Sequence, residues 1–255
     1  MLIDTHTHLY SEQFEEDIEE VIARAKNNGI ERFYLPAIDK SYTDKMLALE
    51  SQYADSMFAM MGLHPCSVHP ETIEEELKHV QEWLTKRDFK AIGEIGIDLY
   101  WDKEHLTTQQ DAFKTQIEWA KERQLPIVIH CRDAFNEVFD VLEEVKDNQL
   151  FGIFHCFSGT KEDAQRAIDF NLKLGIGGVV TFKNGKIDQF LQDFELKNIV
   201  LETDSPYLAP APFRGKRNES SYLTYVCEKL ATIYNKSPEE IASITTKNAL
   251  ELFER

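Results

Sequence analysis

The sequence predicts a (β/α)8 barrel of the TIM type, and three observations carry this prediction. Short apolar runs rich in β-branched and aromatic residues recur eight times. Stretches with a helical period follow them. The length of 255 residues is the size that eight strand–helix units usually need. The runs cover residues 2–8, 32–38, 57–63, 90–97, 126–131, 151–157, 172–180 and 199–204.

The helical stretches are clearest in three places. Residues 14–25 carry apolar side chains at i, i+4, i+7, i+8 and i+11, and residues 135–145 follow the same kind of pattern. Each pattern predicts a helix with one buried stripe. Ser237, followed by Pro238 and three residues later by Glu240, is typical of the start of a final helix.

A doubly wound open sheet is the alternative fold. It usually has fewer strands and a glycine-rich phosphate loop, but neither G-x-G-x-x-G nor G-x-x-x-x-G-K occurs here. We find no linker and no low-complexity segment. The proline-rich residues 206–212 are interpreted as a long ordered loop after the eighth run. We therefore expect one barrel domain over residues 1–255.

The composition restricts the partners. With 28 Lys and Arg against 45 Asp and Glu, the net charge is −17, so the chain repels nucleic acid and anionic lipid at long range. Any attraction for phosphate must be local, through metal ions or a small basic patch. The four cysteines show no C-x-x-C spacing, which disfavours a zinc finger. Without a signal peptide or a membrane-length apolar run, we expect a cytoplasmic protein with no membrane contact.

Histidines gather at the ends of the predicted strands. His6 and His8 end the first run, His64 follows the third, His130 ends the fifth and His155 lies late in the sixth. In a (β/α)8 barrel these strand ends meet at one face, where the active site lies. Two residues apart on a strand, His6 and His8 share a face and can chelate one cation. Taken alone, such a pair fits a packed pair of rings equally well.

Two carboxylates occupy equivalent places. Glu94 lies inside an apolar run beside Gly93, and burial there is costly unless the carboxylate is paired or binds metal. A buried ion pair with an arginine is the alternative. Asp204 ends the eighth run, where it can ligate a metal and accept a proton from bound water, or instead form a turn before Pro206. Glu202 shares its face and is expected to support a ligand or to contact substrate.

These candidates number six, which is too many for one tetrahedral zinc ion. They fit two divalent metals that share one carboxylate. A water molecule held between two such metals becomes hydroxide near neutral pH. The simplest division gives one metal His6, His8, Glu94 and Asp204, and gives the other Glu94, His130 and His155. Imidazole ligands favour Zn, Mn or Ni, whereas nuclease chemistry often uses Mg, so the identity of the metals stays open.

Motifs along nearly the whole chain resemble those of the TatD-like metal-dependent DNases. They are IDTHTHL at 3–9, GLHP at 62–65, GEIGID at 93–98, IHCRDA at 129–134, HCFSG at 155–159, LETDSPYLAP at 201–210 and PFRGKRNES at 212–220. The last has serine where proline is common. The resemblance implies an amidohydrolase-like barrel and a divalent-metal phosphodiesterase site with ligands at the same six positions. Many barrels of that superfamily bridge metals with a carboxylated lysine, but Lys90 begins its run at the wrong end, which leaves Glu94 as the bridge.

Four basic residues are candidate substrate contacts. Arg214, Lys216 and Arg217 interrupt the acidic chain in the loop after the eighth run, where barrels often hold phosphate; a solvated loop is the alternative. Arg132 follows His130 closely and offers a planar fork to phosphate. His64 is a candidate catalytic residue that hydrogen-bonds phosphate or the leaving oxygen, unless it is a core histidine.

Aromatic and sulfur side chains near the strand ends give weaker signals. Tyr100, Trp101 and Phe157 are placed where they can stack on a base, although packing aromatics are common there. Cys131 and Cys156 each follow a candidate ligand, so alternation along a strand turns both toward the helices as small buried side chains.

The function that these residues predict is a metal-dependent hydrolase of phosphodiester bonds. We expect a 3′–5′ exodeoxyribonuclease acting on single-stranded ends, with Asp204 as proton acceptor and His64 beside the leaving 3′ oxygen. An amidase, lactonase or D-aminoacyl-tRNA deacylase on the same metals is the alternative. A scaffold or sensor that keeps a relic of the metal site is a further one. Preference for DNA or RNA stays open.

Overall fold

Eight parallel strands form the centre of the molecule. The structure is a computed structural model that describes residues 1–254. Three strands pair in one sheet and five in another, each in chain order. They are β1 (Leu2–Asp4), β2 (Ile30–Leu35), β3 (Met57–Ala59), β4 (Ile92–Asp98), β5 (Ile127–Arg132), β6 (Gly152–Phe154), β7 (Leu172–Ile176) and β8 (Ile199–Leu201).

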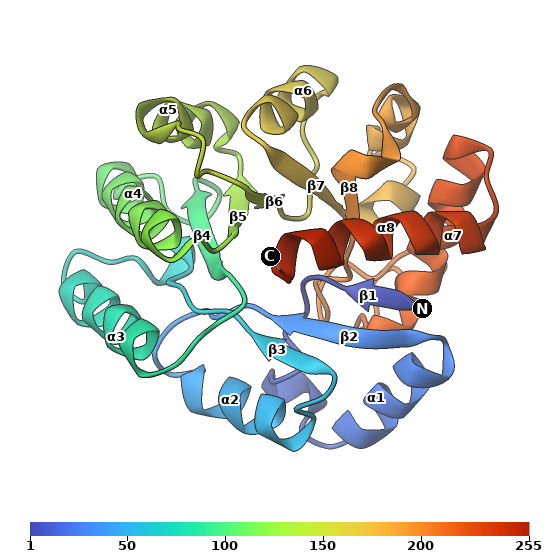
Figure 1. The fold of residues 1–255 in the computed structure, drawn as a ribbon, viewed down its shortest axis with the longest axis horizontal. Helices are drawn as coiled ribbons and strands as arrows, with labels where there is room; N and C mark the ends of the chain where they lie inside the picture. Colours follow the sequence, from blue (N-terminus) through green and yellow to red (C-terminus); the bar gives the residue numbers. More distant parts are fainter. Residues whose placement is uncertain (255) are drawn as a thin grey trace.

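Two short contacts join the sheets into a closed barrel. Met61, just after β3, forms a parallel bridge with Ile92 at the start of β4. On the other side Thr7 bridges Ser205, and the Thr5 N–H donates to the Leu201 carbonyl at 3.0 Å. The predicted (β/α)8 barrel is thereby confirmed, with the strands in a ring and most helices outside it (Figure 1).

Eight α-helices accompany the strands among the described residues. They are α1 (Ile18–Asn27), α2 (Thr43–Gln52), α3 (Ile73–Lys86), α4 (Leu106–Arg123), α5 (Phe135–Val145), α6 (Lys161–Asp169), α7 (Leu223–Tyr234) and α8 (Pro238–Phe253). The predicted start of the last helix is confirmed, because Ser237 and Glu240 cap each other's backbone N–H groups at 3.1 and 3.0 Å.

Two predicted elements differ most from the structure, and the strands in the runs 2–8, 57–63 and 151–157 end earlier than predicted, at Asp4, Ala59 and Phe154. The stretch 14–25 is divided, because Phe14 ends a 3-10 turn and α1 begins only at Ile18. The run 172–180 is a strand only as far as Ile176, and short 3-10 turns replace the α-helix of the seventh unit. A side chain at Gly178 would meet the carbonyl of Leu208 at 2.0 Å, so this segment lies tightly against the loop after β8.

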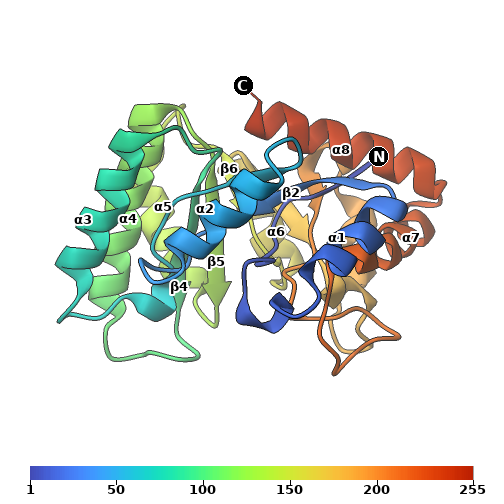
Figure 2. The same ribbon diagram turned by 90° about the horizontal axis from the view of Figure 1, so that it is seen from below.

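The end of the barrel where the strands begin is sealed. A cluster of buried side chains from the strands, among them Ile3, Val128 and Val200, packs with Leu252 and Phe253 of α8. Figure 2 shows α8 on one side of the barrel and the loops after β4 and β8 on the other. Only the side with these loops is therefore open for a site. No helix within residues 1–254 combines the length and apolar character needed to cross a membrane.

Candidate metal centre

The structure brings the six predicted ligands together at the open end of the barrel. His6 and His8 follow β1, Glu94 lies in β4, His130 in β5, His155 follows β6 and Asp204 follows β8. Side-chain atoms from separate strands approach closely. His6 Nε2 lies 3.1 Å from Glu94 Oε2, and His8 Nε2 lies 3.5 Å from Asp204 Oδ1.

Glu94 occupies the middle of this cluster and is almost fully buried. Its Oε2 lies 3.1 Å from His6 Nε2 and 3.6 Å from His8 Nε2. Its Oε1 faces the other way, 2.8 Å from His130 Nδ1 and 3.7 Å from His155 Nε2. Within residues 1–254 its ion-pair partners are all histidines, so the alternative of a buried arginine pair does not apply.

Glycine allows β4 to bring this carboxylate into place. Gly96 has a φ of 146°, and a side chain on it would meet the carbonyl oxygen of His130 at 2.0 Å. The backbone of β5 thus approaches β4 more closely than any residue with a Cβ would permit. As a result, His130 and Glu94 come within hydrogen-bond distance of each other.

Asp204 closes the cluster from the side of β8. Its Oδ1 lies 3.5 Å from His8 Nε2, 3.8 Å from His6 Nε2 and 3.9 Å from His155 Nε2. Burial raises the pKa of Asp204, but the hydrogen bond from His8 and the nearby His155 and His6 outweigh it, and the pKa is lowered overall. The carboxylate is therefore ionised at neutral pH and directed at the histidines.

Hydrogen bonds fix which nitrogen each ring offers. Tyr10 donates its hydroxyl proton to the Pro36 carbonyl, so at 2.8 Å it accepts from His8 Nδ1–H. His8 Nε2 is then the nitrogen that faces Glu94 and Asp204, where a metal ion would take the place of its proton. His155 Nδ1 lies 2.9 Å from Glu202 Oε1, which is an ion-pair contact without the geometry of a hydrogen bond, and it leaves Nε2 as the nitrogen toward the cluster. A carboxylate or similar acceptor behind a histidine is typical of metal sites and raises the basicity of the ligand.

Asp98 is a site residue that the sequence reasoning missed. Its Oδ2 lies 2.9 Å from His130 Nε2, so it orients that ring with Nδ1 toward Glu94. Its Oδ1 accepts the backbone N–H groups of Tyr100 and Trp101, both at 2.9 Å. A signal was available, because residue 98 lies four positions after Glu94 on one strand and so shares its face.

His64 lies beside the cluster and has the wrong tautomer for a ligand. Its Nδ1 accepts the Cys66 backbone N–H at 3.0 Å. Burial lowers the pKa of His64, so the ring is neutral and its single proton must be on Nε2. That Nε2–H lies 3.4 Å from Glu94 Oε1 and 3.3 Å from His130 Nδ1. His64 therefore presents a hydrogen-bond donor to the site.

The electrostatics of the cluster suit a divalent cation. Burial raises the pKa of Glu94, but the neighbouring His64, His6 and His155 outweigh it and hold this pKa well below its usual range. Burial would lower the pKa of His155, but the charges of Glu202 and Glu94 raise it to about 10. The surrounding carboxylates thus keep an extra proton on His155, and a bound cation would displace that proton. Imidazole nitrogen and carboxylate oxygen are also the usual donors for Zn, Mn or Ni.

The four predicted substrate contacts differ in their surroundings. Arg132 is exposed, and within residues 1–254 its guanidinium makes neither an ion pair nor a hydrogen bond. Arg214 and Lys216 are also exposed, and Arg214 lies over the ring of Phe182 at 3.9 Å. Arg217, in contrast, forms a two-pronged ion pair with Asp17 at 2.6 and 2.7 Å.

Two predictions about neighbouring side chains are wrong. Phe157 is 1% exposed and packs among other phenylalanines, so it cannot stack on a base. Cys156 does not turn toward the helices, because β6 ends at Phe154 and Cys156 has a φ of 43°. Its sulfur lies within 4.8 Å of ligand atoms of both His155 and Asp204. Cys131 is partly buried against the core, as predicted.

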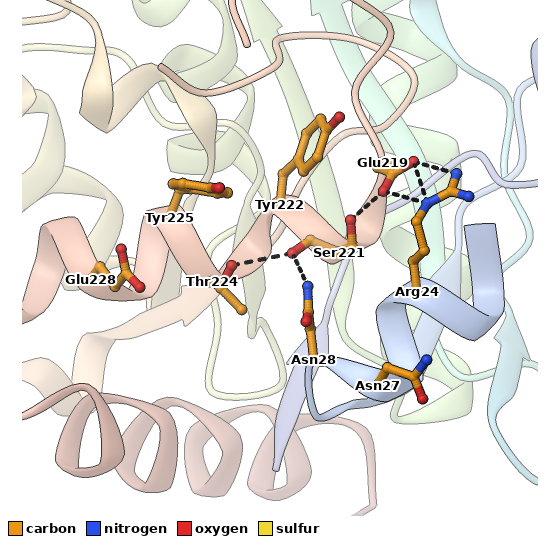
Figure 3. Close-up of a pocket in the computed structure, with 9 residues that line it drawn as sticks. All are labelled: Arg24, Asn27, Asn28, Glu219, Ser221, Tyr222, Thr224, Tyr225 and Glu228. Atoms are coloured by element: carbon orange, nitrogen blue, oxygen red, sulfur yellow. Dashed lines mark hydrogen bonds and ion pairs between the residues drawn. The ribbon is translucent and has the colours of Figure 1, made fainter. Parts of the chain in front are cut away.

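A separate cleft of about 740 Å³ lies on the flank of the barrel between α1 and the start of α7 (Figure 3). Two of its charged groups already pair with each other, because Arg24 lies 2.7 Å from Glu219, and Ser221 donates a hydrogen bond to the same carboxylate. Asn28 donates to the carbonyl of Ser221 at 3.3 Å. None of the six clustered ligands lines this cleft, which we interpret as structural.

Comparison with known proteins decides the family. The family model described as "TatD related DNase" matches residues 3–254. The chain belongs to the TatD family. It is 42% identical over 254 residues to the uncharacterized metal-dependent hydrolase YabD of Bacillus subtilis, covering 99% of both chains. It is 30% identical to the uncharacterized metal-dependent hydrolase YcfH of Escherichia coli K12, covering 99% of this chain and 95% of that one.

Solved structures agree with this assignment. The crystal structure of YJJV, a TatD homologue from Escherichia coli K12, superposes with a TM-score of 0.92 at 29% identity, covering 100% of this chain and 98% of that one. A TatD family hydrolase from Entamoeba histolytica has a TM-score of 0.87 at 21% identity, with 99% and 97% of the chains covered, and shows the shared fold. This TatD family chain is a metal-dependent hydrolase.

Proposed function

We propose that this TatD family chain is a two-metal phosphodiesterase that removes nucleotides from the 3′ end of single-stranded DNA. The placement of Glu94 carries the proposal. One carboxylate oxygen faces His6 and His8, and the other faces His130 and His155. A carboxylate with ligands on both sides is what a pair of cations about 3.5–4 Å apart requires.

The ligands divide between two cations around that carboxylate. His6, His8, Asp204 and one oxygen of Glu94 would hold the first. His130, His155 and the other oxygen of Glu94 would hold the second. When bound, such cations act as Lewis acids toward a phosphate oxygen and lower the pKa of water toward neutrality. Zn, Mn and Ni suit these donors, and Mg is the alternative that nuclease chemistry favours.

The chain's own residues supply the proton transfers. Asp204 is the catalytic acceptor, because its carboxylate is ionised and its side chain is still 13% exposed at the open end of the barrel. His64 is its counterpart, because the Nε2–H of the neutral ring can donate to a phosphate oxygen or to the leaving 3′ oxygen. The guanidinium of Arg132 offers a planar fork to a neighbouring phosphate.

Charge supports a short, single-stranded substrate. The net charge of −17 opposes binding of a long duplex, and among the four predicted substrate contacts only Arg132, Arg214 and Lys216 are without an ion pair. They can neutralise only a few phosphates. The printed family name, which speaks of a DNase, supports DNA as the substrate class.

The test is an exonuclease assay after reconstitution with Zn, Mn, Ni or Mg, using end-labelled single-stranded oligonucleotides. Asp204→Asn keeps an oxygen ligand but removes the proton acceptor, so metal content should persist while turnover falls by about 100-fold or more. Asp188→Asn, which only alters a pair with Lys229 of α7, is the matched control and should keep full turnover.

Two results would contradict the proposal. Wild-type protein that hydrolyses carboxylic esters or amides, but no oligonucleotide with any of the four metals, would make this chain a carbonyl hydrolase. Undiminished turnover of Asp204→Asn at full metal content would show that another group accepts the proton.

A further inference from the structure

Two aromatic side chains beside the metal centre are unusually exposed. Trp101 is 69% exposed, the highest value among the exposed large hydrophobic side chains within residues 1–254, and Tyr100 follows at 52%. Both lie in the loop after β4, on the open side of the barrel (Figure 2). Leaving an indole in water forgoes a large amount of hydrophobic burial, and an exposed apolar patch commonly marks a binding surface.

The turn that carries these rings is firmly held. Oδ1 of the buried Asp98 accepts both of their backbone N–H groups at 2.9 Å. Gln109 of α4 donates to the carbonyls of Asp98 and Asp102 at 3.3 and 3.1 Å. Because Oδ2 of Asp98 also contacts His130 Nε2 at 2.9 Å, one carboxylate fixes the two rings relative to a metal ligand.

Arg132 completes the surface. It lies two residues after His130 on β5, so both side chains share a face of the strand. Its guanidinium lies 3.8 Å above the centre of the Tyr100 ring and 5.6 Å from that of Trp101. The rings of Tyr100 and Trp101 are nearly perpendicular, with centroids 4.9 Å apart. The guanidinium thus covers Tyr100, while most of the indole stays open to solvent.

We propose that Trp101, with Tyr100 beside it, is a stacking platform for the nucleobase next to the scissile phosphate. An open indole and an unpaired guanidinium a few ångströms apart match the two parts of a nucleotide, the flat base and its phosphate. Every base has a π face, so this subsite tolerates any sequence. It also requires an unpaired base, which favours single strands. The inference rests on the proposed function and names how that site holds its substrate.

The experiment is a double-mutant cycle in which one change is Trp101→Ala in the protein and the other is removal of a base from the substrate. Wild type and variant are compared on oligonucleotides with a tetrahydrofuran abasic residue at the last or the penultimate 3′ position, and on the intact strand. Stacking contributes about 1–3 kcal/mol per base, which corresponds to a loss of about 5- to 150-fold in kcat/KM on the intact strand. At the position that stacks, the abasic strand should lose a similar factor with wild type and lose nothing further with Trp101→Ala.

Three controls separate stacking from damage to the site. A strand with abasic residues at both the last and the penultimate 3′ positions keeps the scissile phosphodiester but offers no aromatic face, so Trp101→Ala and wild type should have the same kcat/KM on it. Trp101→Phe keeps a stacking ring and should restore most of kcat/KM on the intact strand. Trp83→Ala removes an indole from α3, on the outside of the barrel, and should leave kcat/KM unchanged on the intact strand.

The outcomes distinguish the two proposals. Equal losses of Trp101→Ala on the doubly abasic strand and on the intact strand would show that Trp101 acts on the metal centre through Asp98, which overturns the stacking subsite. The subsite would also be overturned if the loss in kcat/KM from Trp101→Ala and the loss from an abasic residue were fully additive, whether that residue is last or penultimate. Wild type that hydrolyses methyl p-nitrophenyl phosphate, a small phosphodiester, but no oligonucleotide would overturn the proposed function itself.

Discussion

At the residue scale, Glu94 links the two halves of the ligand cluster. Its two oxygens contact different pairs of histidines, although the side chain comes from a single position in β4. Such a buried carboxylate is costly to desolvate, and the cost is recovered only where cationic or hydrogen-bonding partners surround it. Removing it should therefore affect both halves at once.

Glu94→Ala should lose nearly all bound metal. Each cation loses a ligand, and the repulsion between two cations loses its screening charge. Elemental analysis of the purified variant after dialysis against trace metal measures this directly. Glu76→Ala is the control, because Glu76 is also a buried carboxylate but hydrogen-bonds the Lys40 backbone instead. Two equivalents of retained metal in Glu94→Ala would show that the cations do not share this residue.

At the element scale, the loop after β8 is attached to α1 by ion pairs. Arg217 pairs with Asp17, which immediately precedes α1, and Glu219 pairs with Arg24 within that helix. Arg217 also lies over the ring of Phe14 at 4.7 Å. We infer that Arg217 holds this loop in position, which leaves Arg214 and Lys216 as the cations of the loop that are free to contact substrate.

Arg217→Ala should lower stability more at neutral pH than at low pH, because its ion pair requires an ionised Asp17. The hydrogen bond from Arg217 lowers the pKa of Asp17 below its ordinary value of 3.8. A carboxyl with a depressed folded-state pKa stabilises above its unfolded pKa, and this contribution disappears as the pH falls through the folded value. Because both side chains are about a third exposed, the effect at pH 7 is about 1 kcal/mol or less.

Urea unfolding of wild type and Arg217→Ala at pH 7 and near pH 3 measures this difference. Lys229→Ala, which breaks the comparable pair with Asp188, provides the matched control. We expect the variant to keep the wild-type KM for an oligonucleotide. A KM raised several-fold at unchanged stability would instead show that Arg217 contacts the substrate, as the sequence predicts.

At the scale of the whole molecule, charge limits how nucleic acid is held. The chain carries −17, and many of its Lys and Arg side chains already pair with carboxylates on the outer helices. A broad basic surface is therefore not available for long-range attraction. Binding must depend on a few contacts near the open end of the barrel. Because few phosphates are neutralised, the affinity should change only weakly with salt.

KM for a single-stranded oligonucleotide should depend weakly on salt. Each neutralised phosphate contributes about −0.7 to the log–log slope of 1/KM against salt, so contacts from Arg132, Arg214 and Lys216 would give a slope no steeper than about −3. Replacing Arg214 and Lys216 together by alanine should raise KM and flatten this slope at unchanged metal content. Initial rates against ionic strength, at fixed free metal, measure both effects.

The control for this prediction removes two equally exposed lysines elsewhere. Lys78 of α3 and Lys247 of α8 are each about three-quarters exposed. Their joint replacement changes the net charge as much as the loop variant does, so it should leave KM and the slope close to wild type. Identical behaviour of both double variants would mean that the loop after β8 does not touch the substrate.

Local features of the chain were enough to predict the barrel and the cluster of candidate ligands at one of its ends. The period of apolar residues is encoded along each segment, so strands and helices such as β5 and α5 follow from residues 126–131 and 135–145. Parallel strands in a barrel end on one face, so His6, His130 and Asp204 were expected to meet although they are far apart in the chain. The same rule would have found Asp98 on the face of Glu94.

Packing between distant segments decided the rest. Arg217 and Asp17 are 200 residues apart, and no local sequence pattern shows that the two form an ion pair. Phe157 lies at a strand end like Trp101, yet neighbouring rings bury it while the indole stays exposed. Cys156 does not follow the alternation of side chains along a strand, because β6 ends before it and the backbone turns at this residue. Such choices depend on which side chains surround a position in space, and a one-dimensional period does not contain that information.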